Sequence, residues 1–171
     1  MSTAHQPYYT CIKRSLHAAI CLSNFPSQVV ERHNKPEVEA QTSPELLHNP
    51  ITISRSEQEV TMIESSINSI RVSISFQKSD GIAELVARKY VGFLAQRADR
   101  FHILRKKPVD GFDISFLITH DEAETMHTNK VIDFIIQFIT DIDQDISSMK
   151  LAINNRGRRA ALEFFQTLNF K

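Results

Sequence analysis

The sequence predicts an α+β fold, with a mainly antiparallel sheet packed with helices and a long projecting C-terminal helix. Two patterns carry this prediction. Apolar and polar residues alternate strictly in the middle of the chain, most clearly over residues 70–76, as in half-buried strands. In the last forty or so residues, apolar side chains instead recur every three or four positions, which is the spacing of one helical face. We therefore divide the chain into an α+β domain over residues 1–127 and a long C-terminal helix over residues 128–171, which we expect to be used for subunit assembly.

The elements are expected in the following order. A helix should run from about Pro7, where proline suits the first turn, to Leu22. Residues 27–50 contain three prolines and predict an ordered loop with at most a short turn at 45–47. Alternation then predicts strands over 51–53, 60–63, 70–76, 101–105 and 112–119, the last two joined by a hairpin turn at 108–111. A helix capped by Asp80 should cover 82–97, and a short helical turn 121–126.

The C-terminal helix is predicted to be longer than its domain. At 1.5 Å per residue it would span roughly 60 Å, whereas a compact globule of this length should be only about 40 Å across. Much of its apolar seam would then have nothing within the chain to pack against, which points to a bound partner. The residues expected to form this partner-subunit interface are Ile135, Ile139, Ile142, Ile146, Met149 and Ile153.

Charge is segregated along the same helix. Its first half carries Asp133, Asp141, Asp143 and Asp145, and its second half carries Lys150, Arg156, Arg158, Arg159 and Lys171. The basic end predicts either a patch for an acidic protein surface or an ordinary solvated helix face. Gly157 costs about 1 kcal/mol in a helix interior, so residues 154–157 could fray or bend.

Composition indicates one globular domain in a reducing compartment. The chain has 171 residues, 42% hydrophobic and 23% charged, with zero formal net charge, so neither nucleic acid nor an anionic membrane is an expected partner. Cys11 and Cys21 lie about 15 Å apart along the first helix, too far for a disulfide, and we expect two free, half-buried thiols. No membrane span or signal peptide is evident, which favours the cytoplasm.

Catalytic motifs are lacking in the sequence. Four glycines cannot build a phosphate loop, a dinucleotide fingerprint or a nucleophile elbow. The one local cluster of potential metal ligands is His120, Asp121, Glu122, Glu124 and His127. A metal site would need these ligands to converge, and we interpret them instead as a solvated acidic turn before a helix. We therefore expect no enzyme activity, cofactor, metal site or catalytic residue.

Four blocks of sequence resemble a known family. They are residues 27–39, 66–74 and 103–119 and the Met149-Lys-Leu tripeptide. Together they are similar to the 20-kilodalton subunit (subunit 4) of the actin-related protein 2/3 complex, and the resemblance runs from about Pro7 to Phe170. It implies a non-catalytic scaffold that pairs with the 34–35 kDa subunit through their long C-terminal helices.

The resemblance also implies where such a scaffold works. The pair would form the core that holds the two actin-related proteins, binds the side of a mother actin filament and supports branched nucleation in the actin cytoskeleton. On this hypothesis the filament contact is expected at Lys150, Arg156, Arg158 and Arg159, because the actin surface is acidic. The alternative is a free-standing adaptor or binding module on the same fold.

Overall fold

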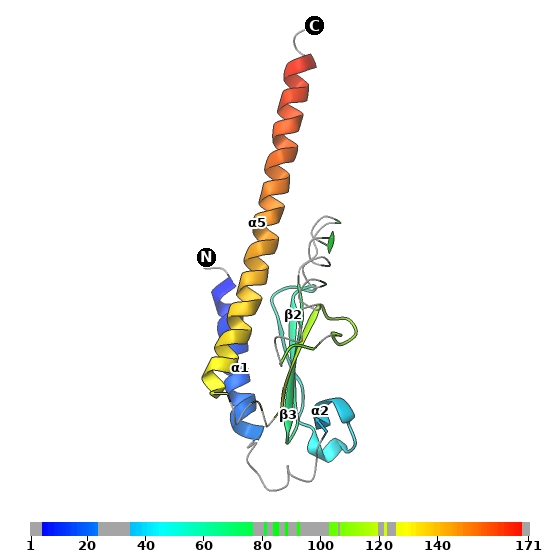
Figure 1. Cartoon of the computed structure of the whole chain (residues 1–171), viewed down its shortest axis with the longest axis vertical. Coiled ribbons are helices and arrows are strands. Elements are labelled where there is room, and N and C mark those ends of the chain that lie inside the picture. Colours follow the sequence, from blue (N-terminus) through cyan, green and yellow to red (C-terminus); the bar gives the residue numbers. More distant parts are fainter. Residues whose placement is uncertain are drawn as a thin grey trace.

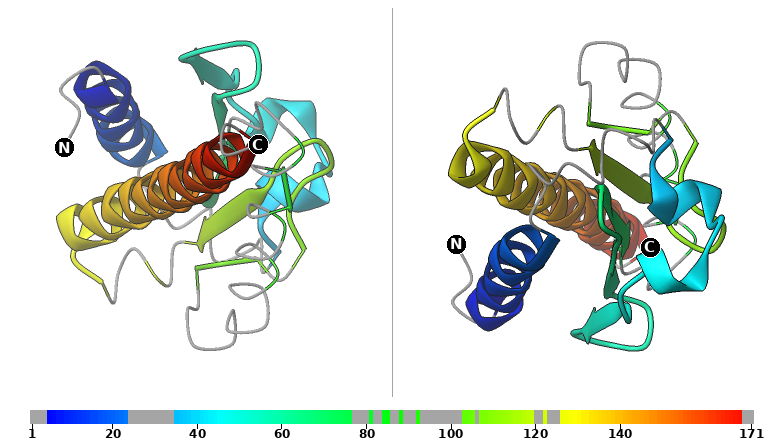
Figure 2. Two further views of the ribbon diagram at one scale, coloured as in Figure 1. Left: turned by 90° about the horizontal axis from the view of Figure 1, so that it is seen from above. Right: turned by 90° about the horizontal axis from the view of Figure 1, so that it is seen from below.

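The computed structural model describes residues 5–23, 35–76, 81, 84–85, 88, 92, 103–105, 107–119, 122 and 126–168, with the backbone alone at 21–23, 150, 161–162 and 164–168. The named elements follow the order α1, α2, η3, β1, β2, β3, β4 and α5. Figure 1 and Figure 2 show α1 and α5 next to each other on one face of the sheet and α2 on the other. The predicted α+β architecture with a long C-terminal helix is confirmed.

Helix α1 (Gln6–Ser23) agrees with the predicted first helix, and Pro7 occupies its first turn. Its buried side chains recur at helical spacing and pack toward the sheet and α5: Tyr8, Tyr9, Ile12, Leu16, Ala19 and Ile20. Cys11 is exposed, because its position lies beside this stripe rather than within it. The expectation of a half-buried thiol at Cys11 is therefore wrong, and the side chain of Cys21 lies outside the described residues.

Two short helical segments precede the sheet, α2 (Glu37–Ala40) and η3 (Pro44–Leu46). The turn predicted at 45–47 corresponds to η3, whereas α2 was not predicted, since four residues are too few to show helical periodicity. Helix α2 is followed by its C-terminal cap residue Gln41, whose φ of 48° is left-handed. The buried carboxylate of Glu37 then accepts a hydrogen bond from the Thr42 N–H at 3.2 Å. Residues 27–34 of the predicted loop lie outside the described residues.

The sheet consists of β1 (Ile51–Ser54), β2 (Val60–Ser65), β3 (Ser69–Ser75) and β4 (Ile114–Thr119), which are antiparallel neighbours in chain order. Its register pairs Ile63 with Val72 and Val72 with Phe116, so these apolar side chains share the face covered by the long helices. The alternation predicted over 70–76 is thus confirmed.

A further segment pairs with the outer edge of β4, in partial agreement with the predicted hairpin. Leu104 forms an isolated bridge with Phe116, and the Arg105 N–H donates to the Ser115 carbonyl at 2.9 Å. Of the predicted strand over 101–105, residues 101–102 lie outside the described part. The turn is closed by the Phe112 N–H, which donates to the Val109 carbonyl at 3.0 Å, and Gly111 there has a φ of 87° that favours glycine.

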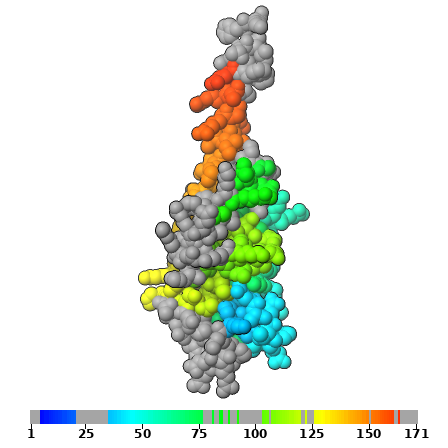
Figure 3. All heavy atoms as spheres, turned by 45° about the vertical axis from the view of Figure 1, so that its right-hand side comes forward, coloured from blue at the N-terminus to red at the C-terminus, as the bar shows by residue number. Residues whose placement is uncertain are grey.

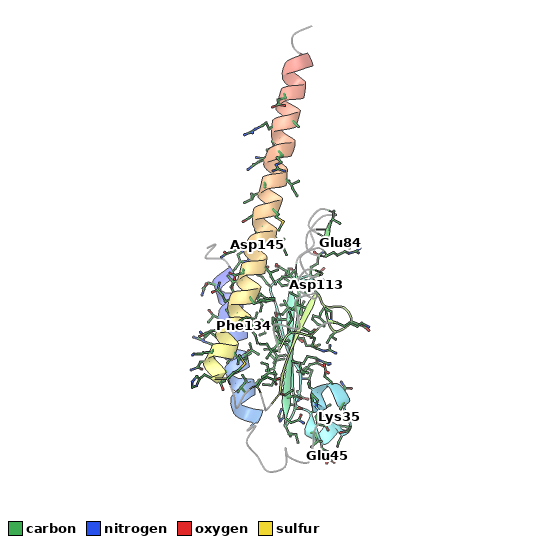
Figure 4. The ribbon with its side chains drawn as sticks, in the orientation of Figure 1. Lys35, Glu45, Glu84, Asp113, Phe134 and Asp145 are labelled. Carbon is green, nitrogen blue, oxygen red and sulfur yellow. The ribbon has the colours of Figure 1, made fainter. Side chains whose placement is uncertain are left out.

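Helix α5 (Thr128–Leu168) contains 41 residues and is continuous through Gly157, so the helix does not fray at 154–157. Its first half completes the core: Phe138 contacts Phe116 edge-on, with ring centroids 5.4 Å apart. Figure 4 labels Phe134 beside the sheet and Asp145 near the place where α5 leaves it. The described residues between 81 and 92 are helical, namely Gly81, Glu84, Leu85, Arg88 and Gly92. The rest of the predicted helix over 82–97 and most of the predicted turn over 121–126 lie outside the described residues.

Candidate subunit interface

The proximal half of α5, residues 128–146, packs within the chain itself. Ile135, Ile139 and Ile142 are at most 1% exposed, and Ile146 is 9% exposed. All four belong to the same core as α1 and the sheet. The expectation that these four isoleucines form a partner interface is therefore wrong. The helix lies lengthwise along the domain, so about 28 Å of it is covered by the chain's own side chains.

The distal half of α5, residues 147–168, continues beyond the domain (Figure 1, Figure 3). Met149 is exposed at 39% and Leu151 at 63%, while Ile153 is partly exposed. Met149 and Ile153 continue the predicted seam. Leu151 lies about 200° around the helix from Met149 and so presents apolar surface on a different side. The seam pattern did not include Leu151, because only residues spaced three or four apart were assigned to it.

Three of the four predicted filament-contact residues are exposed on the distal half. Arg156, Arg158 and Arg159 point to solvent, and the ion pairs within the described part of the chain do not include them. The side chain of Lys150 lies outside that part. The three arginines add positive charge to the helix on which Met149 and Leu151 are exposed, so the projecting segment combines apolar and basic surface.

Four polar side chains meet where α5 leaves the domain, and we name them the exit cluster: Tyr9, Arg55, Glu59 and Asp143. Arg55 lies between β1 and β2, and its Nε donates to Glu59 Oε2 at 2.8 Å while its Nη2 donates to Glu59 Oε1. The same Nη2 lies 3.3 Å from Asp143 Oδ2. The Tyr9 hydroxyl also donates to Asp143. The cluster thus connects α1, the β1–β2 turn and α5.

Aromatic rings cover the guanidinium of the exit cluster. The Arg55 Cζ lies 5.0 Å from the centre of the Tyr8 ring and 6.0 Å from that of Tyr9. The Tyr8 hydroxyl hydrogen-bonds to Thr61 Oγ1 at 2.7 Å. No sequence pattern indicated this cluster, because Tyr9 and Asp143 are 134 residues apart in the chain.

Burial shifts the pKa values of Tyr9, in the exit cluster, and of Tyr8 beside it. It raises the pKa of Tyr8 above its ordinary value. Burial also raises the pKa of Tyr9, and the hydrogen bond to the negative Asp143 raises it further. At Arg55 burial lowers the pKa, but the hydrogen bond to Glu59 and the charge of Asp143 outweigh it and raise the pKa overall. Tyr9 is thus held protonated and Arg55 charged, as hydrogen-bond donors.

The structure describes only some of the acidic and histidine residues that precede α5. Glu122 accepts hydrogen bonds from the N–H and Oγ1 of Thr119, the N–H at 2.8 Å, so it caps the end of β4. His120, Asp121 and Glu124 lie outside the described residues. Within the described part, no three histidine, cysteine or acidic side chains are placed to hold a metal ion. No helix in that part has the length and apolar character needed to cross a membrane.

Comparison with known proteins assigns this arrangement to a family. The family model of the ARP2/3 complex 20 kDa subunit (ARPC4) matches residues 1–167. The chain belongs to this family. It is 55% identical over 166 residues to actin-related protein 2/3 complex subunit 4 of Dictyostelium discoideum, covering 97% of this chain and 98% of the relative.

Two further relatives of the 20 kDa subunit family match with similar completeness. The probable actin-related protein 2/3 complex subunit 4 of Caenorhabditis elegans is 50% identical over 169 residues, which cover 99% of this chain and 100% of the relative. Subunit 4 of Saccharomyces cerevisiae is 50% identical over 162 residues, covering 94% and 95%. The resemblance found in the sequence is confirmed, and the match to the family model includes residues 147–167 of the projecting half of α5.

Proposed function

We propose that the chain is a non-catalytic scaffold subunit of the ARP2/3 complex and that it pairs with the 34–35 kDa subunit through the distal half of α5. The observation that carries this proposal is the exposure of Met149 and Leu151 on a helix whose last buried isoleucine in the described part is Ile146. Membership in the 20 kDa subunit family is the basis for assigning the chain to this complex. The projecting helix supplies surface for a neighbour.

The distal half of α5 resembles one side of a helix–helix interface. Met149 and Ile153 continue the spacing of the buried proximal isoleucines. A second helix laid along this seam would cover them at an interaxial distance of about 8–10 Å. The proposed partner-subunit interface along this seam therefore keeps Met149 and Ile153, without the four buried isoleucines, and Leu151 lies on another side of the helix.

We further propose that the subunit works in the cytoplasm with the actin cytoskeleton, as part of the core that binds the mother filament and supports branched nucleation. The exposure of Arg156, Arg158 and Arg159 supports a filament contact, because exposed positive charges favour association with an acidic surface such as that of actin. Lys150 remains a candidate for the same contact from its position in the helix.

The decisive experiment for complex membership is a native mass measurement of the protein isolated from its own cells. A stable heptameric assembly that contains two actin-related proteins is the expected result. A lone chain or a homodimer would contradict the proposal and favour the free-standing adaptor.

Pairing is tested separately by co-expression with the 34–35 kDa subunit. The chain alone should be poorly soluble at high concentration, because Met149 and Leu151 are exposed, and the partner should rescue its solubility. A matched pair of variants localises the contact: Met149→Asp should abolish co-purification, whereas Gln144→Asp, at an exposed polar position five residues earlier on another side of the helix, should leave it unchanged. Normal co-purification of Met149→Asp would contradict the assigned surface.

A further inference from the structure

We propose that the exit cluster sets the direction in which the distal half of α5 leaves the domain, so that the chain presents this helix to its partner in a prearranged orientation. The consequence for assembly rests on the proposed function. The structural part concerns this chain alone and can be measured without any partner.

Asp143 lies close to the point where α5 leaves the domain. It lies between Ile142 and Ile146, which are the last two buried residues of α5 in the described part of the chain. Beyond them, the described side chains of the helix are exposed or partly exposed. The exit cluster is therefore located at the last turns that the domain holds, where a fixed contact has the largest effect on the direction of the segment that follows.

The exit cluster connects three separate parts of the fold. Tyr9 comes from α1, Arg55 and Glu59 flank the β1–β2 turn, and Asp143 comes from α5. The turn itself is closed by the Arg55 N–H, which donates to the Glu59 carbonyl at 2.9 Å. The contacts approach Asp143 both from the neighbouring helix and from the end of the sheet, so they oppose tilting in more than one plane.

The contacts of the exit cluster are directional. Apolar packing is non-directional, so isoleucines in a core resist separation more than they resist a small tilt. Hydrogen bonds weaken steeply when their angles change, and the planar guanidinium of Arg55 binds both oxygens of Glu59 in a fork. The side chains of Arg55 and Asp143 are each 17% exposed, so water competes little for these bonds.

The length of the projecting segment makes direction important. The segment from 147 to 168 extends roughly 33 Å, so a tilt of about 10° would move its tip by roughly 6 Å. Two packed helices are separated by only about 8–10 Å, so such a displacement would move the tip off a partner helix. A chain that holds the helix in place before binding avoids the loss of affinity that an unfavourable orientation causes.

The test is a distance measurement between two spin labels on the full-length chain. The labels replace Lys107, on the hairpin beside β4, and Asn155, on the distal half of α5; both are exposed. The native Cys11 and Cys21 are changed to serine. The Asp143→Ala variant should show a distance distribution that is broader, or shifted by several ångströms, relative to the unchanged chain.

The matched control is Asp133→Ala. Asp133 lies on the same helix and also forms an ion pair with α1, to Lys13 at 2.6 Å, but its side chain is 59% exposed and far from the exit. This control should leave the distribution unchanged. An unchanged distribution for Asp143→Ala, in a chain that keeps its circular dichroism spectrum, would overturn the proposal. Should Asp143→Ala unfold, Tyr9→Phe decides, because it removes one hydroxyl and keeps the ring in the core; an unaltered distribution there would equally overturn it.

Binding of the 34–35 kDa subunit tests the consequence. If the correct orientation falls to one tenth of the population, the dissociation constant should rise by about tenfold for Asp143→Ala and not for Asp133→Ala. A changed distance distribution with unchanged affinity would overturn the prearranged orientation as a requirement for pairing. If the unchanged chain does not bind the 34–35 kDa subunit, that result contradicts the proposed function. The spin-label distances then still test whether the exit cluster sets the direction of α5.

Discussion

Replacing Ile142 by alanine should destabilise the free chain by about 2–5 kcal/mol, because the removed side chain is 1% exposed and packed in the core. The same replacement at Met149, which is 39% exposed, should change the free energy of unfolding by no more than about 0.5 kcal/mol. Both residues lie on α5 and share one helical spacing. The comparison therefore separates the part of the seam that the chain covers itself from the part left for a partner.

The assay is urea unfolding of the purified chain in dilute solution, with the free energy extrapolated to water. A domain of this kind is stable by about 5–15 kcal/mol, so the loss at Ile142 should be a large fraction of the total. Binding to the 34–35 kDa subunit is then measured on both variants under conditions in which both are folded. Met149→Ala should weaken binding by about tenfold or more, as a contact near the centre of an interface does.

Two results would refute this reasoning. An Ile142→Ala chain as stable as the unchanged chain would show that the isoleucine is not in the core, and it would again be a candidate partner contact. A Met149→Ala chain with unchanged affinity would remove Met149 from the interface. The charged variant Ile142→Asp should unfold the domain by burying an unpaired carboxylate, so its loss of assembly would carry no information about the partner surface.

Substitutions at Gly157, at Tyr9 and at the three exposed arginines probe the distal half of α5 and the exit cluster. Gly157→Ala should stabilise the distal half of α5 by about 0.5–1 kcal/mol, since an added Cβ meets no atom within 4 Å; slower amide hydrogen exchange there would confirm it, and faster exchange would refute it. Because folding raises the pKa of Tyr9 above 10.0, the free energy of unfolding should fall as pH rises beyond about 10, where the unfolded chain loses this proton first. That fall should be less steep in Tyr9→Phe, and an identical slope in urea titrations would count against the assignment. A complex with Arg156→Glu, Arg158→Glu and Arg159→Glu should assemble normally but bind filament sides weakly in a co-sedimentation assay, and unchanged binding at low salt would assign these charges to solubility or to assembly.

The sheet and the two long helices could be predicted because each repeats a local pattern over many residues. Residues 70–76 alternate, and β3 buries Ile70, Val72 and Ile74 on one face. Helix α2 could not be predicted in this way. It contains four residues, and its position depends on contacts distant in sequence, such as the Glu37 N–H donating to Asn68 Oδ1 at 2.9 Å.

The error over the proximal isoleucines has a physical reason. Helical spacing shows which residues share a face, but it does not show whether that face meets the chain's own core or another protein. Ile142 and Met149 are two turns apart and indistinguishable by this criterion, although one is buried and the other exposed. The comparison of helix length with globule diameter correctly indicated that some of the helix projects. It did not indicate where the projection begins.

The acidic residues of α5 show the same limit for charge. Asp133, Asp141 and Asp143 look equivalent in the sequence, as one negatively charged half of a helix. In the structure, Asp133 forms an exposed ion pair with Lys13, and Asp141 accepts a hydrogen bond from Gln137 of its own helix at 2.7 Å. Asp143 differs because it faces both Tyr9 and Arg55. Removing the charge at Asp133 or Asp141 therefore disturbs only exposed contacts, whereas removing it at Asp143 leaves Arg55 without one of its two acidic neighbours at the point where the helix leaves the domain.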